Sequence, residues 1–237
     1  CVLKYGAQDI HHKNPKKVSK SKTLYMKTQR IRIHFSKTKA MQYTGHLDLR
    51  RAWVRTFRRA HLALSYSQGY TPRPQLNLAA PLPLGFLSTG EIGDFWLENQ
   101  YPLNTIQKSL QDALPPGLRI NHLKEISDIH GDKLPNLVRS AFYHVSFFSE
   151  VTDLNEHLQE ILNKNQIKRE RKGKSYDLRP LIYSLEVIPP GDEAKHRVQM
   201  HLSHLPGATG RPDEVIRELD INPYHTQICR KKIILET

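Results

Sequence analysis

The sequence predicts an α+β fold with antiparallel sheets. Short segments alternate polar and apolar residues with a period of two, which is typical of half-buried strands, and amphipathic helical segments separate them. Within residues 30–130 these segments follow the order β-α-β-β-α-β, and residues 138–237 repeat that order. This is the order of the ferredoxin-like split unit. We therefore expect two tandem ferredoxin-like units, each of a size that is usual for a domain.

The first unit is expected to begin with a strand over residues 30–36, whose Arg and His side chains lie on the outer face. A helix follows over residues 45–60, with Thr44 as its N-cap. An extended stretch over residues 64–80 is interrupted by Gly69 and two prolines. The remaining elements are a strand over residues 93–98, a helix over 104–114 and a strand over 118–124.

The second unit is expected to repeat this pattern. Pro212 at a first helical position, with acids directly after it, is typical of a helix start. The alternative is a single mixed α+β domain with a hairpin-rich centre. The predicted strands cover residues 141–149, 167–172, 196–202 and 227–235, and the predicted helices cover 151–163 and 212–219.

The composition is that of a folded chain. Of the 237 residues, 38% are hydrophobic and 25% are charged. No run approaches the ~18 apolar residues of a membrane span, and no secretory signal opens the chain. Cys1 and Cys229 are too few for a disulfide framework or a closed zinc site, and the histidines lack metal-ligand spacing. We expect a cytoplasmic protein with no metal site and no membrane partner.

Positive charge is concentrated in the first part of the chain. Residues 10–90 contain 16 Lys and Arg residues against one acid, whereas residues 91–237 contain 19 against 21 acids. Residues 1–29 are expected to be a basic linker at the tail of an upstream domain, because no Met opens the chain and residues 11–29 lack periodicity. The asymmetry favours a polyanion, either a nucleic acid or an acidic membrane surface. The alternative is a solubilising tail on an ordinary domain.

The first predicted helix has one apolar face and one arginine face. At 100° per residue its apolar residues share an arc that can dock on a sheet, and four arginines occupy the neighbouring arc. Solvated helix faces usually mix charges of both signs, whereas no acid follows here. Guanidinium groups can donate two N–H groups to one phosphate, so this face predicts a row of phosphate contacts. The apolar residues are Leu49, Trp53, Phe57 and Ala60, and the arginines are Arg51, Arg55, Arg58 and Arg59.

Asp48 is the acid of this region and lies in the first turn of the helix. A carboxylate there interacts favourably with the helix dipole and can form an ion pair with Arg51, so a structural role is favoured. A catalytic role would need a partner such as His46 and a substrate beside both.

The stretch after the helix is rigid, polar and aromatic. Gly69 permits a positive φ, and the prolines around Arg73 hold the chain extended. Tyr66 and Tyr70, beside Arg73, are candidates for stacking on exposed bases, although local packing of each tyrosine is equally compatible with the pattern.

A second basic loop, made of Lys168, Arg169, Arg171 and Lys172, can widen such a surface. Its Gly-Lys-Ser tripeptide lacks the earlier glycine and the apolar strand of a phosphate-binding loop. No self-contained catalytic motif is present in the sequence.

Residues 45–74, together with residues 80–85 and the pair Gly90-Glu91, resemble a bacterial family of radical-SAM-associated domains, the domain of unknown function 2344. The family pattern is a Ser-His-Leu-Asp-Leu helix start, spaced arginines and then Tyr-Ser-Gln-Gly-Phe-Asn-Pro-His-Pro. The matching residues are His46, Leu47, Asp48, Leu49, Arg51, Arg55, Arg58, Arg59, Tyr66, Ser67, Gln68, Gly69, Pro72 and Pro74.

Members of this family commonly follow a cobalamin-binding radical-SAM enzyme in one polypeptide. The resemblance implies that a 4Fe-4S cluster, SAM and cobalamin belong to an upstream radical SAM domain, which is then a partner, and that this chain holds no cofactor. Gly45, Thr71 and Arg73 depart from the pattern. Arg73 stands where the family usually has His, which leaves an anion contact but no acid–base role, because arginine stays protonated.

Three functions are compatible with these features. The leading hypothesis is a non-catalytic module that binds RNA, such as tRNA or rRNA, and presents it to the radical SAM enzyme. The second is an RNA-modifying enzyme, since tandem ferredoxin-like units also occur in pseudouridine synthases, with Asp48 as the catalytic candidate. The third is a protein-interaction platform for the radical SAM core or a nuclease.

Overall fold

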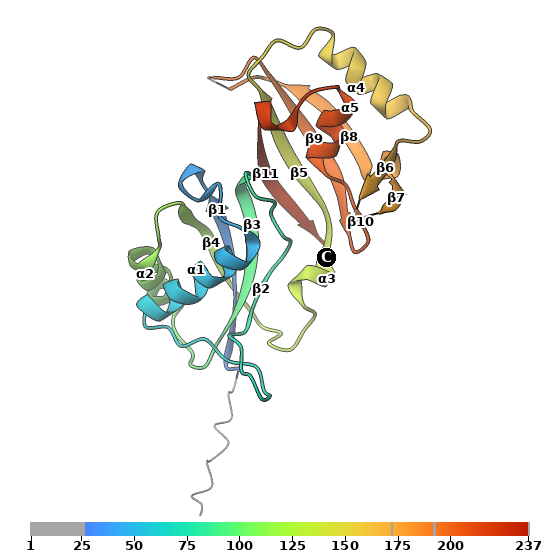
Figure 1. The fold of residues 1–237 in the computed structure, drawn as a ribbon. Helices are drawn as coiled ribbons and strands as arrows, with labels where there is room; N and C mark the ends of the chain where they lie inside the picture. Colours follow the sequence, from blue (N-terminus) through green and yellow to red (C-terminus); the bar gives the residue numbers. More distant parts are fainter. Residues whose placement is uncertain (1–26, 172, 192, 237) are drawn as a thin grey trace, which may run out of the picture.

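The computed structural model describes residues 27–171, 173–191 and 193–236 (Figure 1). The first half of this part contains four strands and two helices in the predicted order. The strands lie in the order β4-β1-β3-β2, and all of these pairs are antiparallel. The elements are β1 (Gln29–Lys37), α1 (His46–Arg59), β2 (Leu76–Leu78), β3 (Leu87–Leu97), α2 (Leu103–Ala113) and β4 (Leu118–Ile126).

The second half repeats this strand order as β11-β5-β9-β8, again with antiparallel pairs. A short helix, α3, joins the two halves, and β6 and β7 form a separate two-stranded sheet. The elements are α3 (Leu134–Leu137), β5 (Val138–Phe147), α4 (Leu154–Asn163), β6 (Lys168–Arg171), β7 (Lys174–Asp177), β8 (Ile182–Ile188), β9 (His196–Leu205), β10 (Ala208–Thr209), α5 (Pro212–Glu218) and β11 (Thr226–Leu235).

The two halves share one nine-stranded sheet, because β11 pairs in parallel with β3 at Cys229–Leu87 and Arg230–Ser88. Gly90 permits this approach, since a Cβ atom there would lie 2.2 Å from the carbonyl oxygen of Lys231. The predicted α+β class with mostly antiparallel pairing is confirmed. The ferredoxin-like interpretation of each half stays a prediction.

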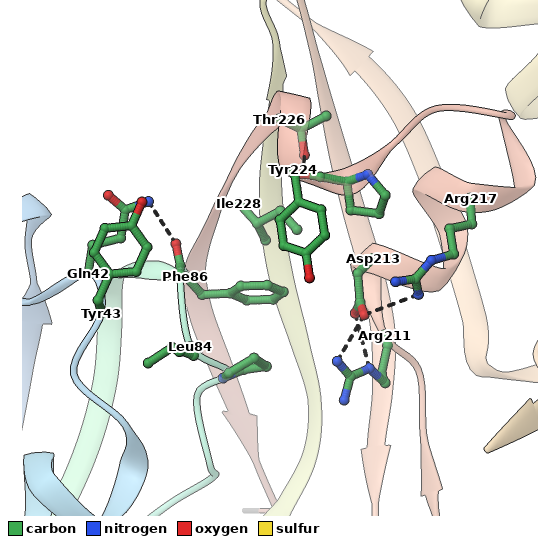
Figure 2. Close-up of a pocket in the computed structure, with 13 residues that line it drawn as sticks. Gln42, Tyr43, Leu84, Phe86, Arg211, Asp213, Arg217, Tyr224, Thr226 and Ile228 are labelled. Carbon is green, nitrogen blue, oxygen red and sulfur yellow. Dashed lines mark hydrogen bonds and ion pairs between the residues drawn. The ribbon is translucent and has the colours of Figure 1, made fainter. Parts of the chain in front are cut away.

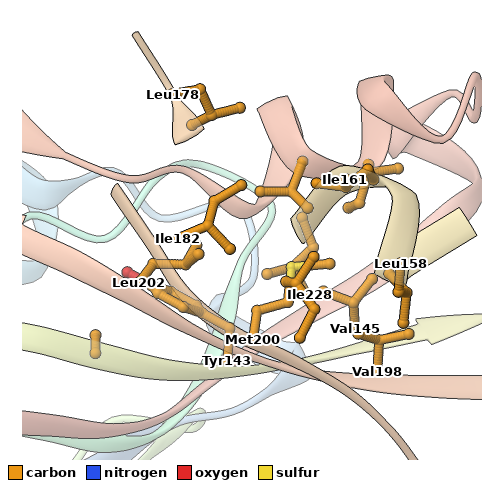
Figure 3. Packing of buried hydrophobic residues seen from close by; sticks show 14 of the residues in the cluster. Tyr143, Val145, Leu158, Ile161, Leu178, Ile182, Val198, Met200, Leu202 and Ile228 are labelled. Carbon is orange, nitrogen blue, oxygen red and sulfur yellow. The ribbon is translucent and has the colours of Figure 1, made fainter. Parts of the chain in front are cut away.

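The helices pack on one face of the sheet. In the first half Trp53 of α1 contacts Phe35 and Phe95 of the strands, with ring centroids 5.0 and 5.2 Å apart. Figure 3 shows the core of the second half, where Leu158 and Ile161 of α4 pack over the strands. Residues alternate between the faces of a strand, so the side chains between these core positions lie on the opposite face.

Three local expectations need correction. Gly45, not Thr44, is the N-cap of α1, and its lack of a side chain leaves that end without a side-chain cap. The basic strand expected over residues 167–172 belongs to the β6–β7 hairpin, and β8 takes the place beside β9. Arg30 lies on the face opposite Ile31 and Ile33, as the alternation predicts, but it is buried there, because its guanidinium is paired with the buried carboxylate of Asp94 and donates to carbonyl oxygens of residues 128 and 132.

Candidate nucleic-acid interface

The packing of α1 determines where its arginines point. Leu49, Trp53 and Phe57 are buried on the sheet, as the periodicity predicts. The side of the helix that faces away from them carries Arg55 and Arg58, both exposed. Three buried anchors in more than two turns of helix fix its rotation about its own axis, so the arginine face is held outward by the core.

An arginine groove runs along this face, with a volume of about 470 Å³. Among the residues that the structure describes, none of those lining it is acidic. Guanidinium groups crowded in this way repel one another unless an anion lies between them. The groove is lined by Leu47, Arg50, Arg51, Val54, Arg55, Arg58, Arg73 and Pro74.

A second hollow of about 470 Å³ continues the groove and shares Arg50, Arg73 and Pro74 with it. Lys27 and Lys133 add two further cations to its lining. The ammonium nitrogen of Lys27 lies 4.9 Å from the ring centroid of the buried Trp96, so a cation–π contact helps to position this lysine in the lining of the hollow. The two hollows form one continuous basic surface from α1 to the end of β3.

Asp48 and Arg51 form the ion pair that the structural interpretation predicts, at 2.9 Å between Oδ1 and Nη1. The two side chains are 63% and 68% exposed, so the pair is solvated and weak. It leaves Arg51 at the edge of the groove with part of its charge neutralised.

His46 does not face Asp48, because residues two apart on a helix point to different sides. Its Nδ1 atom is buried without a hydrogen-bond partner. Burial lowers the pKa of this imidazole, and the nearby cations Arg50 and Arg230 lower it further, against the opposing effect of Glu91. The structure therefore does not bring His46 and Asp48 together as an acid–base pair.

Arg59 joins α1 to the second helix of this half. Its Nε and Nη2 atoms donate to the carbonyl oxygen of Ala113, at 3.1 and 2.5 Å, at the end of α2. A cation at this position satisfies an otherwise free carbonyl group and favours the helix dipole. Arg59 thus joins α1 to α2 and does not line the groove.

We expect Arg59→Gln to lower the free energy of unfolding by about 1 kcal/mol, because it removes hydrogen bonds from a charged donor to the end of α2. The same change is expected to leave RNA affinity unaltered. Chemical denaturation and a binding titration on the same variant check both parts, and a large loss of affinity with unchanged stability would contradict this assignment.

The loop after α1 contributes one of its three predicted residues to the groove. Arg73 is exposed and lines both hollows. Tyr70 lies fully exposed next to Gly69, whose φ of 136° shows the positive value that the sequence predicts. Tyr66 is half-buried and bridges to Pro74 across the loop, so it supports the base of the loop. Neither tyrosine lines the groove.

The second basic loop lies apart from the groove. Figure 1 shows the β6–β7 hairpin and α1 at opposite sides of the molecule. Arg169 is paired with Glu214 and Glu218 of α5, so its charge is neutralised within the second half. Lys168 and Arg171 are exposed, and Lys172 lies outside the described residues.

A cavity of about 320 Å³ lies between the halves (Figure 2). Tyr43 and Leu84 line it from the first half and Tyr224 from the second. Its arginines differ from those of the groove, because Arg211 and Arg217 are each paired with a carboxylate of α5. This cavity therefore offers aromatic surface without free positive charge.

Beneath the junction of the halves lies a buried ion pair. Arg230 is 0% exposed and donates to both carboxylate oxygens of Glu91, at 2.8 and 2.6 Å, and Glu91 is 2% exposed. Nη1 of Arg230 donates to the carbonyl oxygen of Pro81, and Nη2, which also binds Glu91, donates to that of Ala80. The guanidinium thus joins β11, β3 and the segment after β2 at one point.

His204 lies near this pair, and its Nδ1 atom is buried without a hydrogen-bond partner. Burial lowers the pKa of His204 to about 4, helped by the positive charge of Arg230. An unfolded histidine titrates near 6.5, so between pH 6.5 and 4 the unfolded chain binds a proton that the folded one does not. Folding is therefore weakened as the pH falls through this window.

We expect the wild type to lose about 3 kcal/mol more stability than a His204→Gln variant between pH 7 and pH 4, from the shift at ~1.36 kcal/mol per pKa unit. Urea denaturation of both proteins across this range measures the difference. Parallel pH profiles of the two proteins would show that His204 does not titrate abnormally.

The sequence interpretation missed three cations of the basic surface, namely Arg50, Lys27 and Lys133. A helical wheel contains the signal for Arg50, which shares the side of Val54 and Arg58, whereas Arg59 is turned by a further 100° from Arg58. Lys27 and Lys133 reach the surface only through the pairing of distant strands, so no local pattern identifies them.

Two further properties of the described part of the chain concern membranes and metals. None of its helices combines the length and apolar character needed to cross a membrane. Within the same residues, no three His, Cys, Asp or Glu side chains are grouped so that they could hold a metal ion.

Comparison with known protein families matches residues 30–212 to a family described as an uncharacterized protein conserved in bacteria, DUF2344. A comparison with curated proteins finds no match. The matched region includes the arginine groove, both hollows apart from Lys27, and the motif residues from His46 to Pro74. Since this region spans well over half of the sequence, the chain belongs to the DUF2344 family.

Proposed function

We propose that this chain is a non-catalytic RNA-binding module whose arginine groove holds the phosphates of a structured RNA such as tRNA or rRNA. The observation that carries the proposal is the groove itself, which gathers five arginines and no lining acid in the described part of the chain. These cations are not needed to hold α1 in place, because Leu49, Trp53 and Phe57 already anchor the helix on the sheet.

The geometry suits a nucleic-acid backbone. Arg51 and Arg58 are seven residues apart, which is about 10 Å along a helix at 1.5 Å per residue. Each guanidinium can donate two N–H groups to one phosphate. Arg73 lies across the groove on the following loop, so phosphates can be held from two sides.

The wider context of the proposal is presentation of the RNA to a radical SAM domain upstream of this chain, in which the iron–sulfur cluster, SAM and cobalamin would reside. Two alternatives lead to different observations. Modification of RNA by the chain itself, abolished by Asp48→Asn with binding intact, would favour an enzyme. Association with the radical SAM core or a nuclease that persists after nuclease treatment would favour a protein platform.

The proposal is tested by measuring RNA affinity against salt concentration. Phosphate binding predicts a steep linear dependence of log K on log salt, and each arginine removed from the groove reduces the slope by about one unit. The double variant Arg51→Ala, Arg55→Ala should therefore show a slope smaller by about two units. A matched control is Arg217→Ala, whose side chain is already paired with Glu214. A flat slope in the wild type, or equal slopes in both proteins, would reject the proposal.

A further inference from the structure

The helix-free face of the second half of the sheet carries a group of rings. Tyr143 and Val145 of β5 and Met200 of β9 point into the core beneath α4 and α5 (Figure 3). Because side chains alternate along a strand, Phe142 and His201 point to the opposite face. These two residues lie directly opposite each other in the register of β5 and β9, the two central strands of this half.

The rings of Phe142 and His201 are stacked, with centroids 4.0 Å apart and planes at 12°. Tyr183 of β8 approaches His201 edge-on, with centroids 5.0 Å apart, and is 48% exposed. The stack runs from strand to strand, because the two residues are paired across β5 and β9. The second face of the Phe142 ring is therefore directed toward β11, on the other side of β5.

The position opposite Phe142 on β11 is a lysine, Lys232, and both it and Lys231 are exposed. Beside these lysines lies a cavity of about 310 Å³, lined also by His34 and His122 of the first half. None of its lining residues in the described chain is acidic. The acid of this region is Glu186, which lies on β8 at the far side of the ring stack from the lysines.

We propose that this face is a second RNA-binding surface, on which an unpaired base stacks against the outer face of Phe142 while Lys231 and Lys232 hold the neighbouring phosphates. The inference rests on the proposed RNA-binding function and adds to it a preference for single-stranded segments. The arginine groove lies on the helix-covered side of the sheet, so one RNA molecule would contact the module from two sides.

The chemistry of the face identifies this occupant. Sheets whose central strands carry ring side chains bind unpaired bases by stacking, which works for every base because each has a π-face. The lysines supply the charge complementary to phosphate at the free end of the stack. An aliphatic protein surface would complement this face poorly, because the rings present their edges outward and two exposed cations lie beside them.

The test compares a non-self-complementary single-stranded RNA of about 12 nucleotides, within the range that such surfaces cover, with a blunt duplex of the same length. We expect Phe142→Leu to weaken binding of the single strand at least ~5-fold, since one base stack is lost, and to leave duplex binding and the salt slope unchanged. The double variant Lys231→Gln, Lys232→Gln should lower the salt slope for the single strand by about two units. Because this double variant leaves Phe142 unchanged, it keeps the test valid if Phe142→Leu is unstable.

The matched controls are Tyr224→Leu, which removes an exposed ring elsewhere, and Lys108→Gln with Lys164→Gln, which removes one charge from α2 and one from the residue after α4. Equal single-strand affinity in the Phe142 variant, the double lysine variant and these controls would overturn the inference, while groove-dependent duplex binding would leave the proposed function standing. Absence of all RNA binding in the wild type would defeat both. Self-association of the RNA-free protein that is lost in Phe142→Leu would show that the face binds a second copy instead.

Discussion

Glu91→Gln is expected to lower the free energy of unfolding by about 3–5 kcal/mol, the cost of leaving one partner of a buried ion pair without its counter-charge. Arg230 would keep its positive charge with no contact to water, held only by neutral partners, the carbonyl oxygens of Ala80 and Pro81 and the side chain of Tyr143. For a protein of this size the loss corresponds to a melting temperature lower by roughly 6–20 °C. Calorimetry or denaturation at neutral pH measures it.

Two matched variants separate this effect from a general loss of charge. Glu236→Gln removes the partner of Arg139 in an exposed ion pair and should change stability by less than about 1 kcal/mol. The double variant Glu91→Met, Arg230→Met should recover much of the stability lost in Glu91→Gln, because apolar replacements of both partners leave no buried charge. If Glu91→Gln were as stable as Glu236→Gln, the pair would not join the two halves as described.

The triple variant Arg50→Gln, Arg55→Gln, Arg58→Gln is expected to weaken RNA binding at least ~100-fold, since each lost contact from a charged donor is worth ~1.5–3 kcal/mol. Its melting temperature should be unchanged or slightly higher, because like charges one turn apart on a helix repel by a few tenths of a kcal/mol. A binding titration at fixed salt and a thermal melt test these opposite directions together.

The control for the triple variant removes the same charge from elsewhere, by Lys108→Gln, Arg119→Gln and Lys164→Gln. These side chains line neither the groove nor its continuation. If the control lost as much affinity as the triple variant, net charge rather than the groove would attract RNA. If the triple variant unfolded, the double variant Arg55→Gln, Arg58→Gln, which leaves the hydrogen bond from half-buried Arg50 to Pro74 in place, would carry the same test.

The features that the sequence predicts well are those set by local periodicity. The spacing of Leu49, Trp53 and Phe57 predicts the buried face of α1, and the same helical wheel predicts that the arginines point outward. β8 was missed because its register shifts between Ile182 and Ser184, which breaks the alternation that marks a strand. An irregular strand of this kind can be recognised only from the strand with which it pairs.

Features that depend on distant pairing could not be predicted. Arg230 and Glu91 are 139 residues apart and meet because β11 joins β3. Arg30 is basic and lies in an alternating strand, so the pattern predicts an exposed side chain, whereas the pair with Asp94 and the segment after β4 bury it on that face. The charge excess of residues 10–90 is therefore partly neutralised in the fold, whereas Arg55, Arg58 and Arg73 of the groove remain exposed.

The most direct measurement is NMR of the arginine side-chain Nε–Hε groups during titration with RNA. Binding in the groove predicts shifts for Arg50, Arg55, Arg58 and Arg73, with Arg230 unperturbed in the core. Shifts confined to Arg211 and Arg217 of the second half, or no arginine shifts at saturating RNA, would contradict it.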